Sequence, residues 1–285
     1  NYIQDVDENS GRKVIYMVRN DEYYGGTAKI SRFKLHVYNS ADDIISALAI
    51  NEVNAVADLS PIEAAQVNKE KYVVTYTPIQ SGVYAILNNK SQNLSSVNIR
   101  KALQLATDTT KIRTSLGANS PALDLPLTNS QLSGDIPKAD QYDIARARSI
   151  FDEEGWKVGD SGYRQKDGQQ FNLSVVVMND SELEKVLSTV VDQWRDLNIN
   201  IDTRVVDPDD ASQDVIQGVL QPRNFDILIY RLSLGADPDV YAYWHSSQAN
   251  ANGLNFPNYS NQVTDDALST ARARTEPDLR NAKYL

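Results

Sequence analysis

The chain has 285 residues, of which 41% are apolar, and this is enough for one large domain or two ordinary ones with a proper core. Lys and Arg number 28 against 38 Asp and Glu, so the net charge is −10, which argues against binding nucleic acid or an anionic membrane, because both need clustered positive charge. The sequence contains no cysteine, which excludes disulfides, thiol nucleophiles and thiolate metal sites and leaves the compartment open.

The two ends of the sequence do not look like natural termini. No stretch approaches the roughly 18 apolar residues that predict a membrane-spanning helix, and the first residues, NYIQD, lack the basic and then apolar pattern of a signal peptide. Residues 278–285 read as a helix without a Gly or Pro stop signal. We therefore expect both ends to be cut from a longer chain.

The first part of the chain is expected to alternate strands and helices. Residues 41–50 carry apolar side chains at helical spacing behind Ser40, a plausible N-cap, and a second short helix follows Pro61. Four segments rich in β-branched and aromatic residues predict strands: residues 13–19, 34–38, 72–76 and 82–87. This alternation predicts an α/β arrangement.

The second part combines helices with strands after a long polar connection at residues 118–140, which holds three prolines. The predicted elements are a helical stretch from residue 98 to just beyond Asp108, helices over 142–154, 181–197 and 209–219, a hairpin over 163–178, strands over 200–206 and 225–231, and two helices after Thr264. The strands at 200–206 and 225–231 should share a sheet. The helix at 181–197 should pack on it through Val186, Leu187, Val190, Val191 and Trp194.

Three stretches in one order carry a family resemblance. The first is AILNNK at residues 85–90, followed by VNIRKALQLATD at 97–108. The second is ARARSIFDEEGW at 145–156, continuing to GYRQKDG at 162–168. The third runs from DILIY at 226–230 through DPD, WHS and NYSN to Asp265 and Asp266. Upstream, NDEYYGG at 20–26 also fits, with Tyr24 where the pattern usually has Trp.

Together these stretches resemble the family 5 extracellular solute-binding proteins, which include the oligopeptide, dipeptide and nickel-binding components of ABC importers. The resemblance implies a mixed α/β (α+β) fold like that of type II periplasmic binding proteins, with the solute enclosed between two lobes. Residues 1–86 would be a remnant of lobe I and residues 87–285 most of lobe II, without the C-terminal return to lobe I. Residues 82–88 are the candidate crossing strand, and lobe closure would be a hinge motion.

Other chemistry is poorly supported. Asp5, Asp7 and Asn9 have the spacing of a calcium loop, but Ser10 stands where Gly is needed and Tyr16 where Glu is needed, so a turn between strands is the better interpretation. The sequence has only two histidines, His36 and His245, which excludes a multi-histidine metal site and weakens nickel binding. Gly25 and Gly26 lack the other residues of a phosphate loop. No nucleophile elbow occurs, so we expect no catalytic residues, no metal site and no cofactor.

The candidate ligand contacts lie at the end of the last predicted strand and beyond it: Tyr230, Arg231, Ser233, Asp237, Tyr241 and Trp244. The run DPD at 237–239 is suited to cap a helix at the cleft edge, where Tyr241 and Trp244 would stack on a ligand. For Trp244, core packing is an equally good interpretation. For Arg231, a structural charge at the strand end, facing solvent or paired with an acid, is the better one.

One departure from the family pattern bears on specificity. The resemblance implies an Asp shortly before the Asp-Pro pair that holds a peptide's free ammonium, because a closed cleft needs a fixed counter-charge. That position falls here on Leu234 or Gly235, and neither carries a charge. We therefore expect weak preference for a free peptide N-terminus.

The resemblance implies the function of a substrate-binding component of an ABC importer. It would capture a peptide or another small solute and deliver it to a membrane permease, outside the cytoplasm, in the periplasm or at the cell surface. It would contact the membrane only through an N-terminal lipid anchor that this sequence lacks, and it would not bind nucleic acid. A ligand-sensing receptor on the same scaffold is the alternative, because fold does not fix function. A hydrolase of an unrelated α/β class is a second alternative, but this sequence lacks the nucleophile, base and orienting residue that such an enzyme needs.

Overall fold

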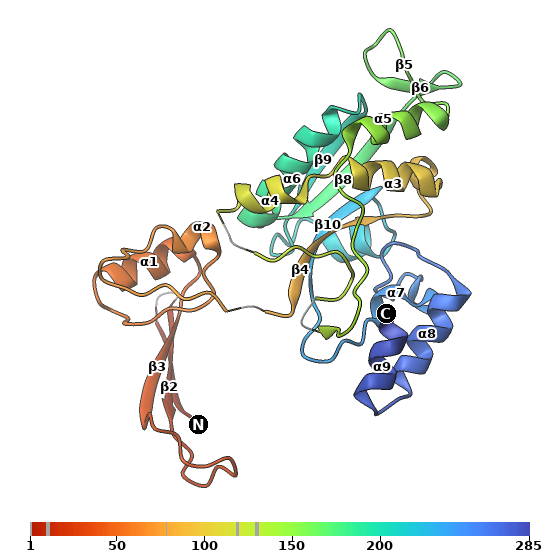
Figure 1. Ribbon diagram of the computed structural model, residues 1–285. Coiled ribbons are helices and arrows are strands. Elements are labelled where there is room, and N and C mark those ends of the chain that lie inside the picture. The colour runs from red at the N-terminus through yellow and green to blue at the C-terminus, as the bar shows by residue number, and fades with distance from the viewer. Residues whose placement is uncertain (1, 10–11, 78, 118–119, 129–130) are drawn as a thin grey trace. The chain divides into compact units, whose positions relative to one another are not determined.

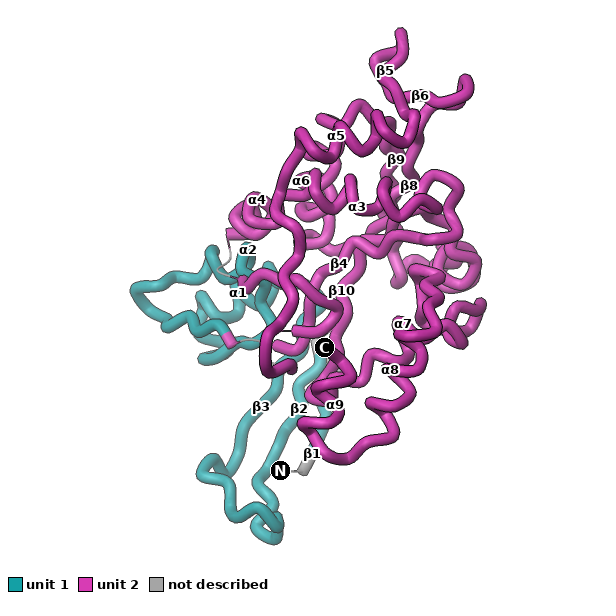
Figure 2. Tube along the Cα trace, turned by 45° about the vertical axis from the view of Figure 1, so that its right-hand side comes forward, with its two compact units in different colours: residues 1–76 teal, residues 77–285 magenta. Residues whose placement is uncertain are grey.

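A computed structural model of the protein describes residues 2–9, 12–77, 79–117, 120–128 and 131–285. The chain divides into two compact units, Asn1–Tyr76 (unit 1) and Thr77–Leu285 (unit 2), which Figure 2 colours separately. This division falls before the boundary at residue 86 that the resemblance implied, because the strand after residue 80 pairs within unit 2. None of the helices in the described ranges has both the length and the apolar composition of a membrane span.

Unit 1 contains a three-stranded antiparallel sheet in the order β1–β2–β3 (Figure 1). Its strands are β1 (Tyr2–Asn9), β2 (Arg12–Val18) and β3 (Arg32–Val37). The predicted strands over 13–19 and 34–38 are thus confirmed. Asp5 and Asp7, with their calcium-like spacing, lie on β1 and not in a turn or loop.

Two short helices follow the sheet, as predicted. Helix α1 (Ala41–Ala49) begins at the N-cap Ser40, whose side chain accepts from the backbone N–H of Asp43, and α2 (Pro61–Ala64) begins with a capping box. The predicted strand over 72–76 is wrong, because these residues form no regular element. The Tyr72 hydroxyl donates to the Leu48 carbonyl at 2.7 Å, which ties the segment to the end of α1.

Unit 2 is built on a four-stranded mixed sheet in the order β4–β10–β8–β9. Strand β4 (Ser81–Leu87) pairs antiparallel with β10 (Ile227–Ser233), while β8 (Asn172–Met178) runs parallel to both β10 and β9 (Asn200–Val206). The predicted strands over 200–206 and 225–231 therefore share one sheet, separated by β8. Because β4 is an edge strand of this sheet, the candidate crossing strand belongs to unit 2.

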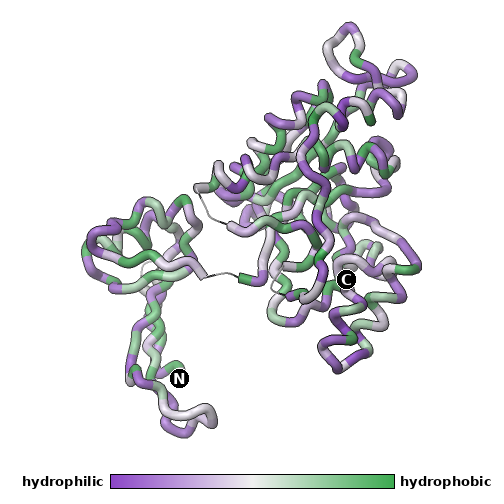
Figure 3. The backbone as a smooth tube through the Cα atoms, viewed as in Figure 1, coloured by the Kyte–Doolittle hydropathy of each residue, from purple (hydrophilic) through white to green (hydrophobic). Residues whose placement is uncertain are grey.

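Helices cover the sheet because most side chains of its central strands are apolar and buried. Figure 3 maps the hydropathy of the residues along the chain. Helix α6 (Ser181–Arg195) packs against β8, β9 and β10, and the five side chains predicted for its apolar face are all buried. The same core takes in α3 (Val97–Leu105) and α5 (Ile144–Glu153), and α4 (Thr109–Ser115) packs on α6. These predicted helices are confirmed.

The opposite face of the sheet packs against a segment whose prediction was wrong. Residues 209–219, expected to form a helix, form turns that end in a π-helix, η3 (Ile216–Leu220). The Asp210 side chain accepts from Ser212 and Gln213, and such local bonds compete with helix formation. Val215 and Val219 of this segment still reach the core beneath Leu228.

A small sheet projects from α5 and accounts for the predicted hairpin over 163–178. It consists of β5 (Lys157–Val158), β6 (Arg164–Lys166) and β7 (Gln169–Gln170), and β8 continues the chain. Buried Arg164 fixes it, because its guanidinium donates to Asp152 at 2.7 Å and to the carbonyls of Trp156 and Leu197.

The remaining elements are short, and all except η1, which packs on α3, follow β10 along the chain. They are the short turns η1 (Gln92–Leu94) and η4 (Ser246–Gln248), and the helices α7 (Tyr241–Trp244), α8 (Gln262–Arg272) and α9 (Pro277–Tyr284). The last two are the predicted C-terminal helices. In the described part of residues 118–140 the chain forms no strand and no α-helix, as predicted.

Candidate functional site

The candidate site begins where β10 ends and the chain enters residues 234–240, here called the post-β10 loop. The Leu234 N–H donates to the Gln80 carbonyl at 2.8 Å, and the Gly235 carbonyl accepts from Gln131 Nε2 at 3.1 Å. Gly235 has φ +70°, a conformation that glycine adopts at little cost. The loop is therefore held between the start of β4 and the long polar connection.

Both acids of the post-β10 loop are already paired. Arg280 of α9 donates to Asp237 Oδ1 at 2.5 Å, and Arg272 of α8 donates to Asp239 Oδ2 at 2.8 Å. The hydrogen bonds that the Arg280 guanidinium donates to Asp237 and to the Tyr284 hydroxyl raise its pKa. Asp239, and not Asp237, accepts from the backbone N–H of Tyr241 at the start of α7. The expected side-chain cap is therefore not formed, because the N-cap residue of α7 is Val240 and Asp239 lies one position before it.

The aromatic residues of α7 pack inward. Tyr241 stacks on His245 with ring centroids 4.1 Å apart, and the Arg272 guanidinium lies 4.5 Å from the Tyr241 ring. Trp244 meets Tyr259 edge to face and contacts the apolar cluster around Val240 and Leu268. The core-packing interpretation of Trp244 accounts for these contacts. Its Nε1 is buried and finds no hydrogen-bond acceptor among the described residues.

The β10 residues of the predicted set point to different faces of the sheet, because side chains alternate along a strand. Tyr230 packs with Phe256 in the cluster that contains Leu228. Arg231 lies on the other side, where its guanidinium donates to Glu182 at 3.0 Å and lies 3.8 Å from Asp180 at the start of α6. The structural interpretation of Arg231 is thus the one the contacts support. Ser233 ends the strand and is exposed.

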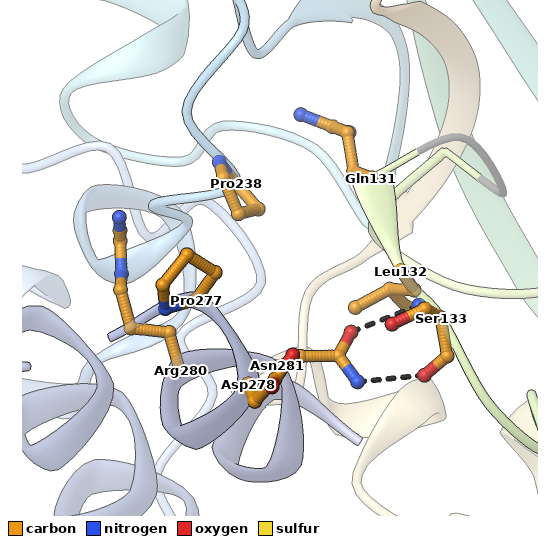
Figure 4. A pocket seen from close by; sticks show the side chains of 8 residues that line it. All are labelled: Gln131, Leu132, Ser133, Pro238, Pro277, Asp278, Arg280 and Asn281. Atoms are coloured by element: carbon orange, nitrogen blue, oxygen red, sulfur yellow. Dashed lines mark hydrogen bonds between the residues drawn. The ribbon is translucent and has the colours of Figure 1, made fainter. Parts of the chain in front are cut away.

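A pocket of about 310 Å³ lies beside the post-β10 loop (Figure 4). It is lined by Gln131, Leu132, Ser133, Pro238, Pro277, Asp278, Arg280 and Asn281. Asn281 closes one side of it, since its side chain both accepts from the Ser133 N–H at 2.9 Å and donates to the Ser133 carbonyl at 2.6 Å. Sequence reasoning missed these residues. They come from segments far apart in the chain, and no local pattern joins them.

The surroundings of His245 do not form a catalytic triad. Its Nδ1 accepts from the Ser247 N–H at 3.1 Å, and Asp265 Oδ1 lies 3.9 Å from the same nitrogen, so Asp265 does not orient the ring as a triad acid does. Asp265 accepts instead from the Ser246 N–H and hydroxyl. Burial alone would raise the pKa of Asp265, but these hydrogen bonds and nearby His245 outweigh it and hold that pKa below its usual range. No group of three or more potential metal ligands occurs in the described ranges.

Comparison with solved structures identifies the fold. The structure of the oligopeptide-binding protein AppA from Bacillus subtilis in complex with a nonapeptide matches with a TM-score of 0.76 and 22% identity, over 98% of this chain and 56% of that one. NikZ from Campylobacter jejuni in complex with Ni(L-His) matches with a TM-score of 0.68 and 19% identity, again over 98% and 56%. The fold is therefore the mixed α/β fold of type II periplasmic binding proteins, as predicted.

The family follows from the sequence. The family described as "Bacterial extracellular solute-binding proteins, family 5 Middle" matches residues 5–253, and the chain belongs to it. AppA of Bacillus subtilis (strain 168) is 24% identical over 280 residues, which cover 95% of this chain and 50% of that protein. Protein XP55 of Streptomyces lividans is 28% identical over 273 residues, covering 93% and 48%. The chain thus spans about half the length of these relatives. Because the family consists of solute-binding proteins, the prediction that this chain is not an enzyme is confirmed.

Proposed function

We propose that these residues form part of the substrate-binding component of an ABC importer, which captures a peptide or a similar small solute between two lobes and delivers it to a membrane permease. The observation that carries the proposal is the family match, which includes both units and the post-β10 loop. Unit 1 would contribute to lobe I and unit 2 to lobe II, with their boundary near residue 76. The protein would act in the periplasm or at the cell surface, held by a lipid anchor outside these residues.

The ligand contacts would come from the end of β10 and the loop after it. Ser233 is exposed and the Asp237 side chain is 62% exposed, so both are accessible to a solute. Tyr241 and Trp244 would form the partly apolar wall behind them, and Tyr230 and Arg231 would fix the strand that presents them. Mostly apolar walls with a few placed polar groups are typical of small-ligand sites.

The charges of this region disfavour a free peptide ammonium. Leu234 and Gly235 carry no charge, and Asp237 and Asp239 are each paired with an arginine. A buried ammonium without a counter-charge costs several kcal/mol. The proposed ligand is therefore a peptide bound mainly through its backbone, or a solute that has no free ammonium.

Calorimetry on the complete encoded polypeptide tests the proposal. A peptide and its N-acetylated form should bind with similar affinity, and Asp237→Asn should change that ratio little. Tight binding of the free peptide alone, lost on acetylation and in Asp237→Asn, would show that Asp237 is an ammonium anchor. A loss confined to Arg231→Ala, in a variant whose unfolding midpoint is unchanged, would indicate an anionic ligand group instead. Mass spectrometry of solute retained through purification names the ligand, and uptake by vesicles that carry the permease separates transport from sensing.

Residues 1–285 alone should bind the same solute weakly. A ligand enclosed by two lobes loses the contacts of any part that is missing, while the ordering and desolvation costs of binding remain. Calorimetry of this chain with the solute identified above is the measurement. Submicromolar binding would contradict the two-lobe account.

A further inference from the structure

His245 joins two elements of the candidate site. It is the C-cap of α7 and the N-cap of η4, with an extended backbone (φ −70°, ψ 137°) between them. Its carbonyl accepts from Asn255 Nδ2 at 3.0 Å, and Asn255 is fully buried, so the backbone of this junction is anchored. The imidazole side chain is 15% exposed and stacks on Tyr241. The ionisable ring is thus the part of this junction whose chemistry changes with pH.

The hydrogen bonds of the ring assign its tautomer. Nδ1 accepts from the Ser247 N–H at 3.1 Å, which caps η4, and a ring nitrogen that accepts a hydrogen bond carries no proton. In the neutral ring the proton therefore lies on Nε2, which donates to Ser269 Oγ at 3.3 Å. Protonation of His245 consequently takes place at Nδ1 and removes the acceptor on which the η4 cap depends.

The groups around Nδ1 can satisfy the protonated ring as well. Asp265 Oδ1 of α8 lies 3.9 Å from Nδ1 and supplies a negative charge, and the Ser247 hydroxyl, 2.9 Å away, can turn to accept the new N–H. Arg272 of α8 lies over the Tyr241 ring, but its charge is offset by Asp239 at 2.8 Å. The three residues of η4 include no titratable side chain. Both protonation states of the ring therefore have partners.

We propose that His245 is a pH-dependent cap: the unprotonated ring holds the start of η4, and the protonated ring releases the Ser247 N–H. Histidine is suited to this role because its charge ordinarily changes between pH 5 and 8. Asp265 continues to hold the Ser246 N–H, so the change is confined to the turn after α7. Because α7 belongs to the proposed ligand wall, solute capture would also depend on pH. That consequence rests on the proposed function, whereas the pH-dependent cap does not.

Nuclear magnetic resonance of residues 1–285 without solute tests the proposal, so its outcome is independent of the proposed function. The sequence contains only two histidines, which makes the ring signals simple to assign. His245→Asn keeps a side-chain oxygen that caps η4 but does not titrate, and His36→Asn is the matched control in unit 1. His245→Ser, which also retains a capping oxygen, is the second variant if His245→Asn does not fold.

At pH 8 the His245 ring should carry its proton on Nε2 alone. From pH 8 to pH 5 the protection of the Ser247 amide against hydrogen exchange should fall about fivefold, the size expected from losing one cap. It should stay constant in His245→Asn and fall as in wild type in His36→Asn. A proton on Nδ1 at pH 8 would overturn the proposal. So would a ring that stays neutral at pH 5, unchanged protection of Ser247, or an equal fall in His245→Asn.

Discussion

Units 1 and 2 differ in where their apolar side chains go. In unit 2 the central strands are buried on both faces and α6 buries its whole apolar stripe. In unit 1 the sheet leaves Phe33, Leu35 and Val37 exposed, and the buried apolar side chains described there belong to α1, α2 and the residues just after α2. Similar strand-forming sequences are therefore buried in one unit and exposed in the other. A strand is stabilised by the layer that covers it and not by β-propensity alone.

The largest expected effect contrasts a core residue of unit 2 with a sheet residue of unit 1. Trp194 is 2% exposed and its Nε1 donates to Thr107 Oγ1 at 2.9 Å, so Trp194→Ala should lower the free energy of unfolding of unit 2 by about 3–5 kcal/mol. Phe33→Ala in residues 1–285 should cost less than about 1 kcal/mol. Urea unfolding followed by circular dichroism measures both. Equal losses would show that the contrast between the units is wrong.

The second prediction concerns buried charge, which in the described residues occurs in unit 2, at Arg164, Arg223 and Asp265. Arg164→Ala leaves the carbonyls of Leu197 and Trp156 without their donor, so it should destabilise unit 2 by roughly 2–3 kcal/mol. Arg146→Ala removes an exposed ion pair with Glu153 and should leave the unfolding midpoint unchanged. If both variants unfold at the wild-type urea concentration, Arg164 does not fix the small sheet.

Helix caps give a smaller effect that tests how locally each unit is stabilised. Asp143 accepts from the Arg146 N–H at the start of α5, a helix that packs into the core, so Asp143→Ala should cost about 1 kcal/mol of unit 2 stability. Ser60→Ala removes the cap of α2, which has only four residues, and should raise amide exchange there without changing global unfolding. A global loss in Ser60→Ala would show that unit 1 folds more cooperatively than its core suggests.

The smallest expected effect is a pH dependence at Asp265. Its pKa is lowered in the folded protein, so below about pH 4, where an unfolded Asp takes up a proton, the unfolded chain binds more protons than the native state. Stability from this group is therefore complete above that pH and is lost as the pH falls through the lowered pKa. The stability difference between wild type and Asp265→Asn should shrink on acidification, with exposed Asp266→Asn as the reference. If the stability difference between wild type and Asp265→Asn does not change from pH 7 to pH 3, this prediction is wrong.

Much of unit 2 was predictable because its signals are local. The spacing of Val186, Val190 and Trp194 predicts a helix face, and strand β9 was predicted with its observed limits. The failures at 72–76 and 209–219 involve side-chain hydrogen bonds, one to a residue 24 positions away along the chain and one local. In one the Tyr72 hydroxyl bonds to α1, and in the other the side chain of Asp210 forms a turn. Helix and strand propensities do not predict such side-chain hydrogen bonds.

The candidate site was less predictable than the fold. The sequence indicated the end of β10 and the residues after it, but it did not indicate that Asp237 pairs with Arg280 or that Arg231 pairs with Glu182. These partners lie about 40 to 50 residues away along the chain. Their pairing is set by how α6, α8 and α9 pack in unit 2. The hydrophobic periodicity of the sequence does not predict it.

By itself, the sequence determined the family, the fold class and most elements of regular structure, because motif order and hydrophobic spacing are written in neighbouring residues. Only the tertiary structure decided that Arg231 pairs with Glu182, that both acids of the post-β10 loop are paired, and that Leu35 and its neighbours form an uncovered apolar face. The physical reason is that pairing and burial are properties of surfaces brought together by the fold. A residue's own neighbours along the chain do not specify them.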